Sequence, residues 1–331
     1  MLERGFRFLH VDDMTALVTS PAPIWMLGIV GLLIWASLRP HAKEPYKILA
    51  LILVFLVEPI SSAIMNAEKR SFPLKFDYFL QAIDHSLGVT AFVVARRFSD
   101  QERAILFALY GSLSAAMITW YGFQLKVKEG RPRQLLIAYA LAYSTCPALY
   151  LIVPACGPRH AFPIAFPLGN PEVRPVLQAL DYWPNAIPSL HFATAFLFVL
   201  FTARKRVLQT LACVYLCGTA AATLTFEHYV IDLIVAIPFA CFVASAAELR
   251  FRSALFELGI VLTWLLLIRF ATPVLTQHPH AVQFCAFLTI LSGAQAIRRA
   301  WSPAAEVRAV DGGEKGHFGG EVAPCQGSCS E

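Results

Sequence analysis

Charged side chains are scarce in this sequence. Only 15% of the 331 residues are Asp, Glu, Lys or Arg, whereas 57% are hydrophobic, and the mean hydropathy is +0.58. A soluble domain carries about 25% charged residues, so this scarcity excludes that class. Apolar windows of roughly 17 to 22 residues recur along almost the whole chain, and each can cross about 30 Å of hydrocarbon. We therefore expect an all-α fold, a polytopic transmembrane helical bundle.

Cysteine pairs with metal-binding spacing are also missing. Five of the eight cysteines lie in apolar spans, where Cys usually packs as a small residue. Cys213 and Cys217 share a helix face, but no His or second Cys pair accompanies them, which makes a zinc site unexpected. Neither Cys156 in a loop nor the two cysteines of the C-terminal tail requires a disulfide.

The apolar windows predict about ten spans. They cover residues 22–38, 48–66, 77–95, 104–124, 134–153, 187–203, 207–226, 229–247, 256–275 and 281–297. Residues 1–21 show no convincing cleavage pattern after a short apolar core, so we interpret them as an interfacial segment. The glycine-rich residues 301–331 are expected to form a disordered tail.

Lysine and arginine indicate the orientation of the second half. Alternating crossings place four basic clusters on one side, which should be the cytoplasm. These clusters are at residues 126–133, 204–206, 250–252 and 298–299. We interpret the net charge of +5 as orientation and lipid contact, with no nucleic-acid role. In the first half the basic residues do not alternate in this way, so we expect one early segment to be re-entrant or interfacial. The candidate is 77–95, which contains Asp77, Asp84 and His85.

Two ionisable residues, His228 and Asp232, stand four positions apart at the start of span 229–247. On a helix they would share one face, about 6 Å apart along the axis. The carboxylate could then take the proton of one ring nitrogen and leave the other as a nucleophile. The pattern also occurs in structural roles, but ionisable groups at membrane depth are costly to keep without a use.

The segment IPSLH at residues 187–191 predicts an anion site at a helix start. Pro188 suits the first turn, and Ser189 lies among the unpaired N–H groups that bind anions. His191 would face that anion and could donate a proton to a leaving oxygen. The intervening spans bring His191 and His228 to the same, non-cytoplasmic surface.

A long loop, residues 154–186, lies on that same surface. Its seven prolines make it stiff enough to cover a site. Arg159, in GPRHAFP, offers a planar fork of donors for phosphate oxygens, although an arginine that touches lipid headgroups would give the same pattern. We expect its neighbour His160 to face solvent.

At these residues the sequence resembles the type 2 phosphatidic acid phosphatase superfamily. IPSLH is similar to the P-S-x-H motif of that family and HYVID to its closing H-x-x-x-D motif, within residues 134–247. The K-x-x-x-x-x-x-R-P motif is missing. KEGRP at 128–132 only approximates it, because Gln124 stands at the lysine position. This segment is also expected on the cytoplasmic side of the membrane, away from the histidines, so we interpret it as a cytoplasmic charge cluster. Ala221 and Ala222 replace a Ser-Arg pair, and Leu190 replaces a glycine. These departures resemble the branch of inositol phosphorylceramide synthases and related inositolphosphotransferase-like enzymes.

The resemblance implies a domain plan and a mechanism. A six-helix catalytic core would occupy residues 134–300, with accessory spans in 22–133. His228 would attack phosphorus and form a phosphohistidine, Asp232 would orient it, and His191 would protonate the leaving oxygen. Arg159 and the amides near Ser189 would hold the equatorial oxygens. No metal or other cofactor is needed in this scheme.

We therefore expect an integral membrane phosphatase or phosphotransferase in the cell (inner) membrane. It would act on a lipid-linked phosphate at the non-cytoplasmic face, with water or a hydroxyl group as the acceptor. One alternative is a transporter with Asp232, Glu58 and Asp84 as relay groups, although no inverted repeat supports it. The other is a non-catalytic membrane scaffold.

Overall fold

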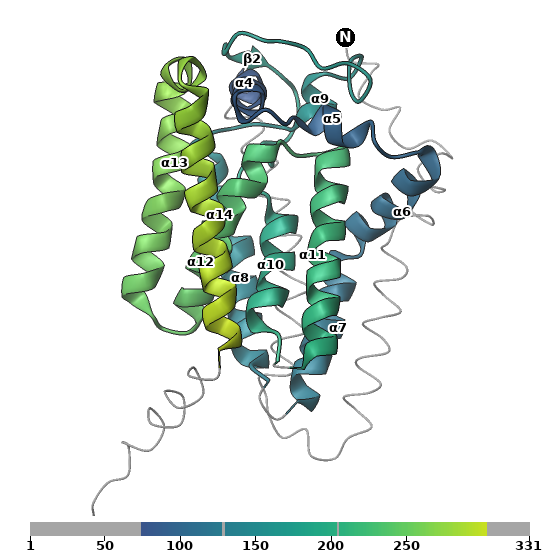
Figure 1. The fold of residues 1–331 in the computed structure, drawn as a ribbon, viewed down its shortest axis with the longest axis vertical. Coiled ribbons are helices and arrows are strands. Elements are labelled where there is room, and N and C mark those ends of the chain that lie inside the picture. The colour runs from purple at the N-terminus through teal and green to yellow at the C-terminus, as the bar shows by residue number, and fades with distance from the viewer. Residues whose placement is uncertain (1–73, 128–129, 204, 303–331) are drawn as a thin grey trace, which may run out of the picture.

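A computed structural model describes residues 74–127, 130–203 and 205–302 (Figure 1). The interfacial segment 1–21, the spans 22–38 and 48–66, Glu58 and the tail beyond Ser302 lie outside the described residues. The helices are α4 (Asp77–Leu87), α5 (Ala91–Ala95), α6 (Asp100–Gly111), α7 (Leu113–Lys126), α8 (Pro132–Tyr150), α9 (Pro158–Ala161), α10 (Leu190–Phe201), α11 (Arg206–Phe226), α12 (Val230–Ala247), α13 (Phe251–Gln277) and α14 (Pro279–Trp301). Two short strands, β1 (Leu74–Lys75) and β2 (Gln178–Ala179), pair antiparallel with Leu74 opposite Ala179.

The long helices form a bundle with α10 at its centre. In Figure 1, α8 and α10 to α14 run along the long axis, while α4, α5, α9 and β2 gather at the upper end. α10 contacts α7, α8, α11, α12 and α14, and every one of its residues except His191 is buried. A helix that is hydrophobic on all sides requires this position, because it has no polar face to present to water.

The C-terminal end of α10 is satisfied by side chains from other segments. The last carbonyl groups of a helix have no partner within it. Arg131 donates to the carbonyl oxygen of Leu200 at 2.8 Å, and Trp301 Nε1 donates to that of Val199 at 3.0 Å. Arg131 also forms an ion pair with Glu248. Arg131, from KEGRP, thus lies at the end of α10 opposite to His191, about 15 Å away along the axis.

The expectation of about ten spans is not supported. In the described part of the chain, α11, α12, α13 and α14 are long and apolar enough to cross a membrane, and α6 with α7 adds a fifth crossing if that pair, bent by 58°, is one span. Segment 77–95 breaks at Gly88 into α4 and α5, and window 187–203 holds only the twelve-residue α10. Counting apolar windows overestimates the number of membrane spans, because a helix buried against protein has the same apolar residues as a helix buried in lipid.

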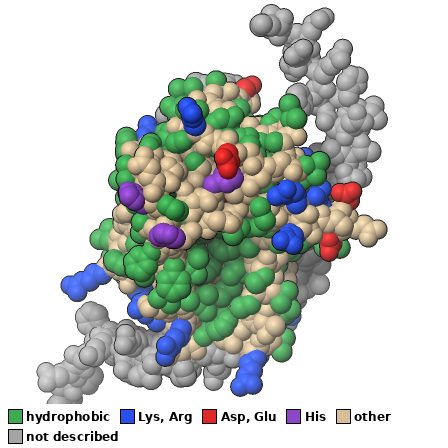
Figure 2. Space-filling model, turned by 45° about the horizontal axis from the view of Figure 1, so that its top comes forward, with side chains coloured by type: hydrophobic (Ala, Val, Ile, Leu, Met, Phe, Trp, Pro, Cys, Tyr) green, Lys and Arg blue, Asp and Glu red, His purple; other side chains and the backbone are tan. Residues whose placement is uncertain are grey.

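The surface of the bundle fits a membrane protein. Large hydrophobic side chains are exposed on α13 and α14, among them Phe256, Phe270 and Phe284. Figure 2 shows hydrophobic side chains gathered on the flank of the bundle, with Lys and Arg along its lower margin. The basic clusters before α8 and after α12 meet at Glu248, which pairs with both Arg131 and Arg250.

Candidate active site

His228 lies in the turn before α12, not in the helix. Tyr229 is the N-cap and the helix begins at Val230, so the expected pairing within one helix is wrong in detail. The pair still forms across the helix start. Nδ1 of His228 is 3.4 Å from Oδ2 of Asp232, and the two side chains are 2% and 0% exposed.

A backbone carbonyl fixes the tautomer of His228. Nδ1 lies 2.8 Å from the carbonyl oxygen of Ala186, and because a carbonyl only accepts, Nδ1 must carry the proton. Nε2 is therefore the lone-pair nitrogen. Asp232 lies near the same N–H, and its Oδ2 accepts the backbone N–H of Tyr229 at 2.7 Å. No motif in the sequence points to Ala186, which is 42 residues away from His228.

His191 opens α10 and faces His228. Their ring centroids are 6.5 Å apart with an interplanar angle of 56°. The His191 ring stacks on Tyr110 of α6 at 3.9 Å and 15°. Among the described residues, no hydrogen-bond partner occupies either ring nitrogen of His191. The structure thus brings together the two predicted histidines and adds Tyr110, which the sequence analysis missed.

Ser189 joins the two motifs. Its side chain accepts the N–H of Phe192 as the N-cap of α10, and its own N–H donates to the carbonyl oxygen of Asp232 at 3.2 Å. Pro188 precedes this cap after a cis peptide bond, so its expected place in the first turn is wrong. Within the described residues the N–H groups of Leu190 and His191 have no acceptor. They remain available to an anion beside the His191 ring.

The loop segment that carries Arg159 docks beside the nucleophile candidate. Arg159 lies on α9 and is exposed. The expectation that His160 faces solvent is wrong, because its Nε2 is 2.8 Å from Oε2 of Glu227 and its ring stacks on Tyr182 at 3.5 Å. Burial raises the pKa of Tyr182, the charge of Glu227 raises it further, and Arg159 lowers it. Glu227 directly precedes His228, so α9 rests on the turn that holds this histidine.

Gly157 and Asp77 hold this loop in place. A Cβ on Gly157, where φ is +89°, would lie 1.9 Å from the carbonyl oxygen of Glu227. The N–H of Gly157 donates to Asp77 at 2.8 Å, as do the N–H of Cys156 at 3.1 Å and the hydroxyl of Tyr229 at 3.0 Å. Burial raises the pKa of Asp77 to about 6, although these hydrogen bonds act to lower it. Asp77 thereby ties the loop to the residue after His228.

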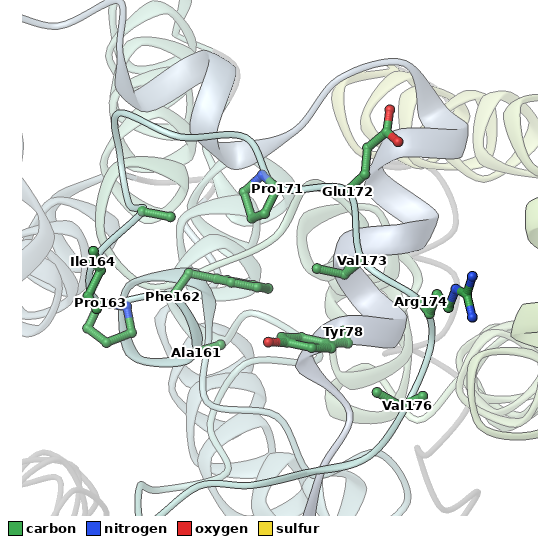
Figure 3. A pocket seen from close by; sticks show the side chains of 11 residues that line it. Tyr78, Ala161, Phe162, Pro163, Ile164, Pro171, Glu172, Val173, Arg174 and Val176 are labelled. Carbon is green, nitrogen blue, oxygen red and sulfur yellow. The ribbon is translucent and has the colours of Figure 1, made fainter.

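A cavity of about 650 Å³ lies beside the end of α9, with Ala161 in its lining (Figure 3). Apolar side chains line most of it, including Phe162, which stacks on Tyr78 at 5.1 Å, and Val173. Arg174 and Glu172 stand at its margin. The cavity includes neither His191 nor His228, so the paired histidines define the candidate site. No three His, Cys, Asp or Glu side chains in the described ranges could jointly hold a metal ion.

Comparison with known proteins gives one family. A family model described as the PAP2 superfamily matches residues 78–247, slightly more than half of the chain. The match starts in α4, well before residue 134, so it is longer than the resemblance expected from the two motifs over residues 134–247. No curated protein and no solved structure matches the chain. The superfamily consists generally of phosphatases, and membership suggests phosphatase or phosphotransferase activity on lipid phosphates. This membrane protein belongs to the PAP2 superfamily.

Proposed function

We propose that this protein transfers a phosphoryl group from a lipid-linked phosphate through a phosphohistidine on His228. The observation that carries the proposal is the approach of His191 and His228 to a ring separation of 6.5 Å, with the proton of His228 held on Nδ1. In-line transfer needs about 3–3.5 Å between nucleophile and phosphorus. It also needs about 2.6–3.2 Å between the acid and the leaving oxygen. A phosphoryl group placed between the two rings could make one contact of each kind.

The reaction would run in two steps. Nε2 of His228 attacks phosphorus and forms an N–P bond while the bond from phosphorus to the lipid oxygen breaks. Burial and the charge of His228 lower the pKa of His191 to about 3. The anionic phosphate would raise this pKa, and the protonated ring then gives its proton to that oxygen. Neutral His191 then takes a proton from the acceptor hydroxyl, which attacks phosphorus and releases His228. Asp232 stabilises the positive charge that develops on the His228 ring.

The start of α10 supports a place for the phosphate. The N–H groups of Leu190 and His191 point from a helix N-terminus, which favours negative charge. Arg159 is the cation that we assign to the remaining oxygens. It is exposed and lies close to the Tyr182–Glu227 cluster, where it could reach a phosphate bound beside His228.

Transfer to a hydroxyl, as in the inositol phosphorylceramide synthase branch, is the form we favour. The chain lacks the lysine and the Ser-Arg pair of the phosphatases, and Arg131 of KEGRP is engaged at the far end of α10. We place the site on the non-cytoplasmic face of the cell (inner) membrane. In Figure 1 the start of α10 and the end of α11 lie at the end of the bundle opposite to the α12–α13 turn and the end of α14, which carry basic clusters.

The test is phosphoryl transfer by the purified protein in detergent. A lipid labelled with ³²P in its phosphate is supplied with water alone or with hydroxyl-bearing lipids, and both free phosphate and labelled product are measured. His191→Ala and His228→Ala should abolish turnover, whereas His278→Ala, an exposed histidine at the α13–α14 turn, should not. Alkaline quenching should trap label on the wild type but not on His228→Ala. Unchanged turnover in both site variants would refute the proposal.

A further inference from the structure

Helix α4 carries two fully buried carboxylates and no residue of either sequence motif. Asp77 and Asp84 are seven residues apart, so they lie on one side of the helix, two turns from each other. Asp77 binds the loop that carries Arg159, as described above. Asp84 reaches a different partner, the start of α12.

Asp84 caps α12 from outside that helix. Its Oδ2 accepts the N–H of Val230 at 2.8 Å and its Oδ1 accepts that of Ile231 at 3.0 Å. The preceding N–H, that of Tyr229, donates to Asp232. Three consecutive donors at this helix start are therefore occupied by carboxylate oxygens, which are well placed at the positive end of the helix.

This arrangement constrains the nucleophile. His228 and Asp232 lie on either side of the segment that Asp84 binds, so the relative position of imidazole and carboxylate depends on where residues 230 and 231 are held. The charges that face Asp84 are those of Asp232 and of the helix start, and burial together with Asp232 raises the pKa of Asp84. Two buried carboxylates close to one another are tolerated because each accepts backbone N–H groups.

We infer that Asp84 is a positioning residue for the phosphoryl transfer proposed above, acting through the first turn of α12 on the His228–Asp232 pair. The inference rests on that proposed function. Both oxygens of Asp84 already accept backbone N–H groups. The burial of this carboxylate therefore does not require the relay role that a transporter would give it.

The test compares Asp84→Asn with wild type. The amide oxygen of asparagine can replace only one of the two carboxylate oxygens of Asp84. Its NH₂ group then faces the N–H of Val230 or Ile231, so the first turn of α12 should loosen. We expect kcat to fall by about 10²-fold, the effect of a misplacement on the order of 1 Å, with KM for the lipid phosphate nearly unchanged. Asp100→Asn, which removes an exposed carboxylate from the first turn of α6, should change neither constant.

Two readouts do not depend on turnover. Hydrogen exchange at the amides of residues 230 and 231 should accelerate in Asp84→Asn, and the modification of His228 by diethyl pyrocarbonate, followed by mass spectrometry, should become several-fold faster. Unchanged exchange and modification in a folded variant would overturn the inference, and so would faster exchange with wild-type kcat. If the wild type shows no turnover but Asp84→Asn still shows faster exchange and faster modification, the proposed reaction is refuted. The positioning of His228 by Asp84 is then still supported.

Discussion

Replacing Gly157 by alanine should lower activity without any change to a residue that contacts phosphate. The added Cβ would lie 1.9 Å from the carbonyl oxygen of Glu227, and no real Cβ comes closer than 3.0 Å. The loop and Glu227 must therefore separate by about 1 Å, and a shift of this size beside His228 should reduce kcat by about 10²-fold. Overpacking should also cost about 1–3 kcal/mol of folding free energy.

Gly88→Ala provides the matched control. Gly88 also has a positive φ, +81°, but a Cβ there would meet no atom within 4 Å. Both variants carry backbone strain of about 1–3 kcal/mol, and only Gly157→Ala adds the collision. Kinetics of lipid phosphate turnover, normalised to the folded fraction from size exclusion, compare the two. Equal kcat values would show that the contact between this loop and Glu227 has no bearing on the reaction.

Three further predictions concern the same end of the bundle. The pKa of Asp77, about 6, is above the value of about 3.9 of an unfolded chain, so the contribution of this carboxyl to stability is complete below pH 4 and is lost as pH rises through 6. The free energy of unfolding of Asp77→Asn, relative to that of wild type, should therefore rise by about 3 kcal/mol between pH 4 and 7. Denaturant unfolding at several pH values measures this difference, and a difference that stays constant across the range would contradict the prediction. Glu227→Ala should free His160, loosen α9 and reduce turnover at least about tenfold, while Glu227→Gln, which can keep the hydrogen bond, should retain most of it. Arg159→Ala should raise KM for the lipid phosphate by about ten- to a hundredfold, the value of a charge-assisted hydrogen bond, and an equal rise in the exposed control Arg174→Ala would argue against a specific role.

The two histidines could be identified from the sequence because the P-S-x-H and H-x-x-x-D motifs consist of residues that are neighbours along the chain. His191 follows a helix cap, and His228 and Asp232 are near each other in sequence, so local rules placed both histidines near the start of a helix, although His228 lies just before α12 and not within it. Their meeting followed from the reversal of the chain between α10 and α11, which brings the start of one helix beside the end of the other although α10 has 12 residues and α11 has 21. The family match confirms the superfamily suggested by these two motifs.

The parts that sequence reasoning missed depend on contacts between distant segments. Ala186 holds the proton of His228, Tyr110 supports His191, and Asp77 and Asp84 bind backbone donors that lie about 80 and 146 residues away. A backbone carbonyl leaves no signature in a sequence. The buried carboxylates did leave one, a pair of Asp residues seven apart in an apolar segment, but nothing local indicates which N–H groups they accept.

The shortness of α10 has a consequence for how the protein is assembled. Twelve residues rise about 18 Å, which is too little to cross about 30 Å of hydrocarbon. Such a segment cannot settle in a bilayer by itself, and the partners of its terminal carbonyls come from the residues just before α8 and from the end of α14. We therefore expect α10 to pack only against neighbouring helices that are already in place. The position of His191 at the start of α10 therefore depends on segments that lie both before and after this helix in the chain.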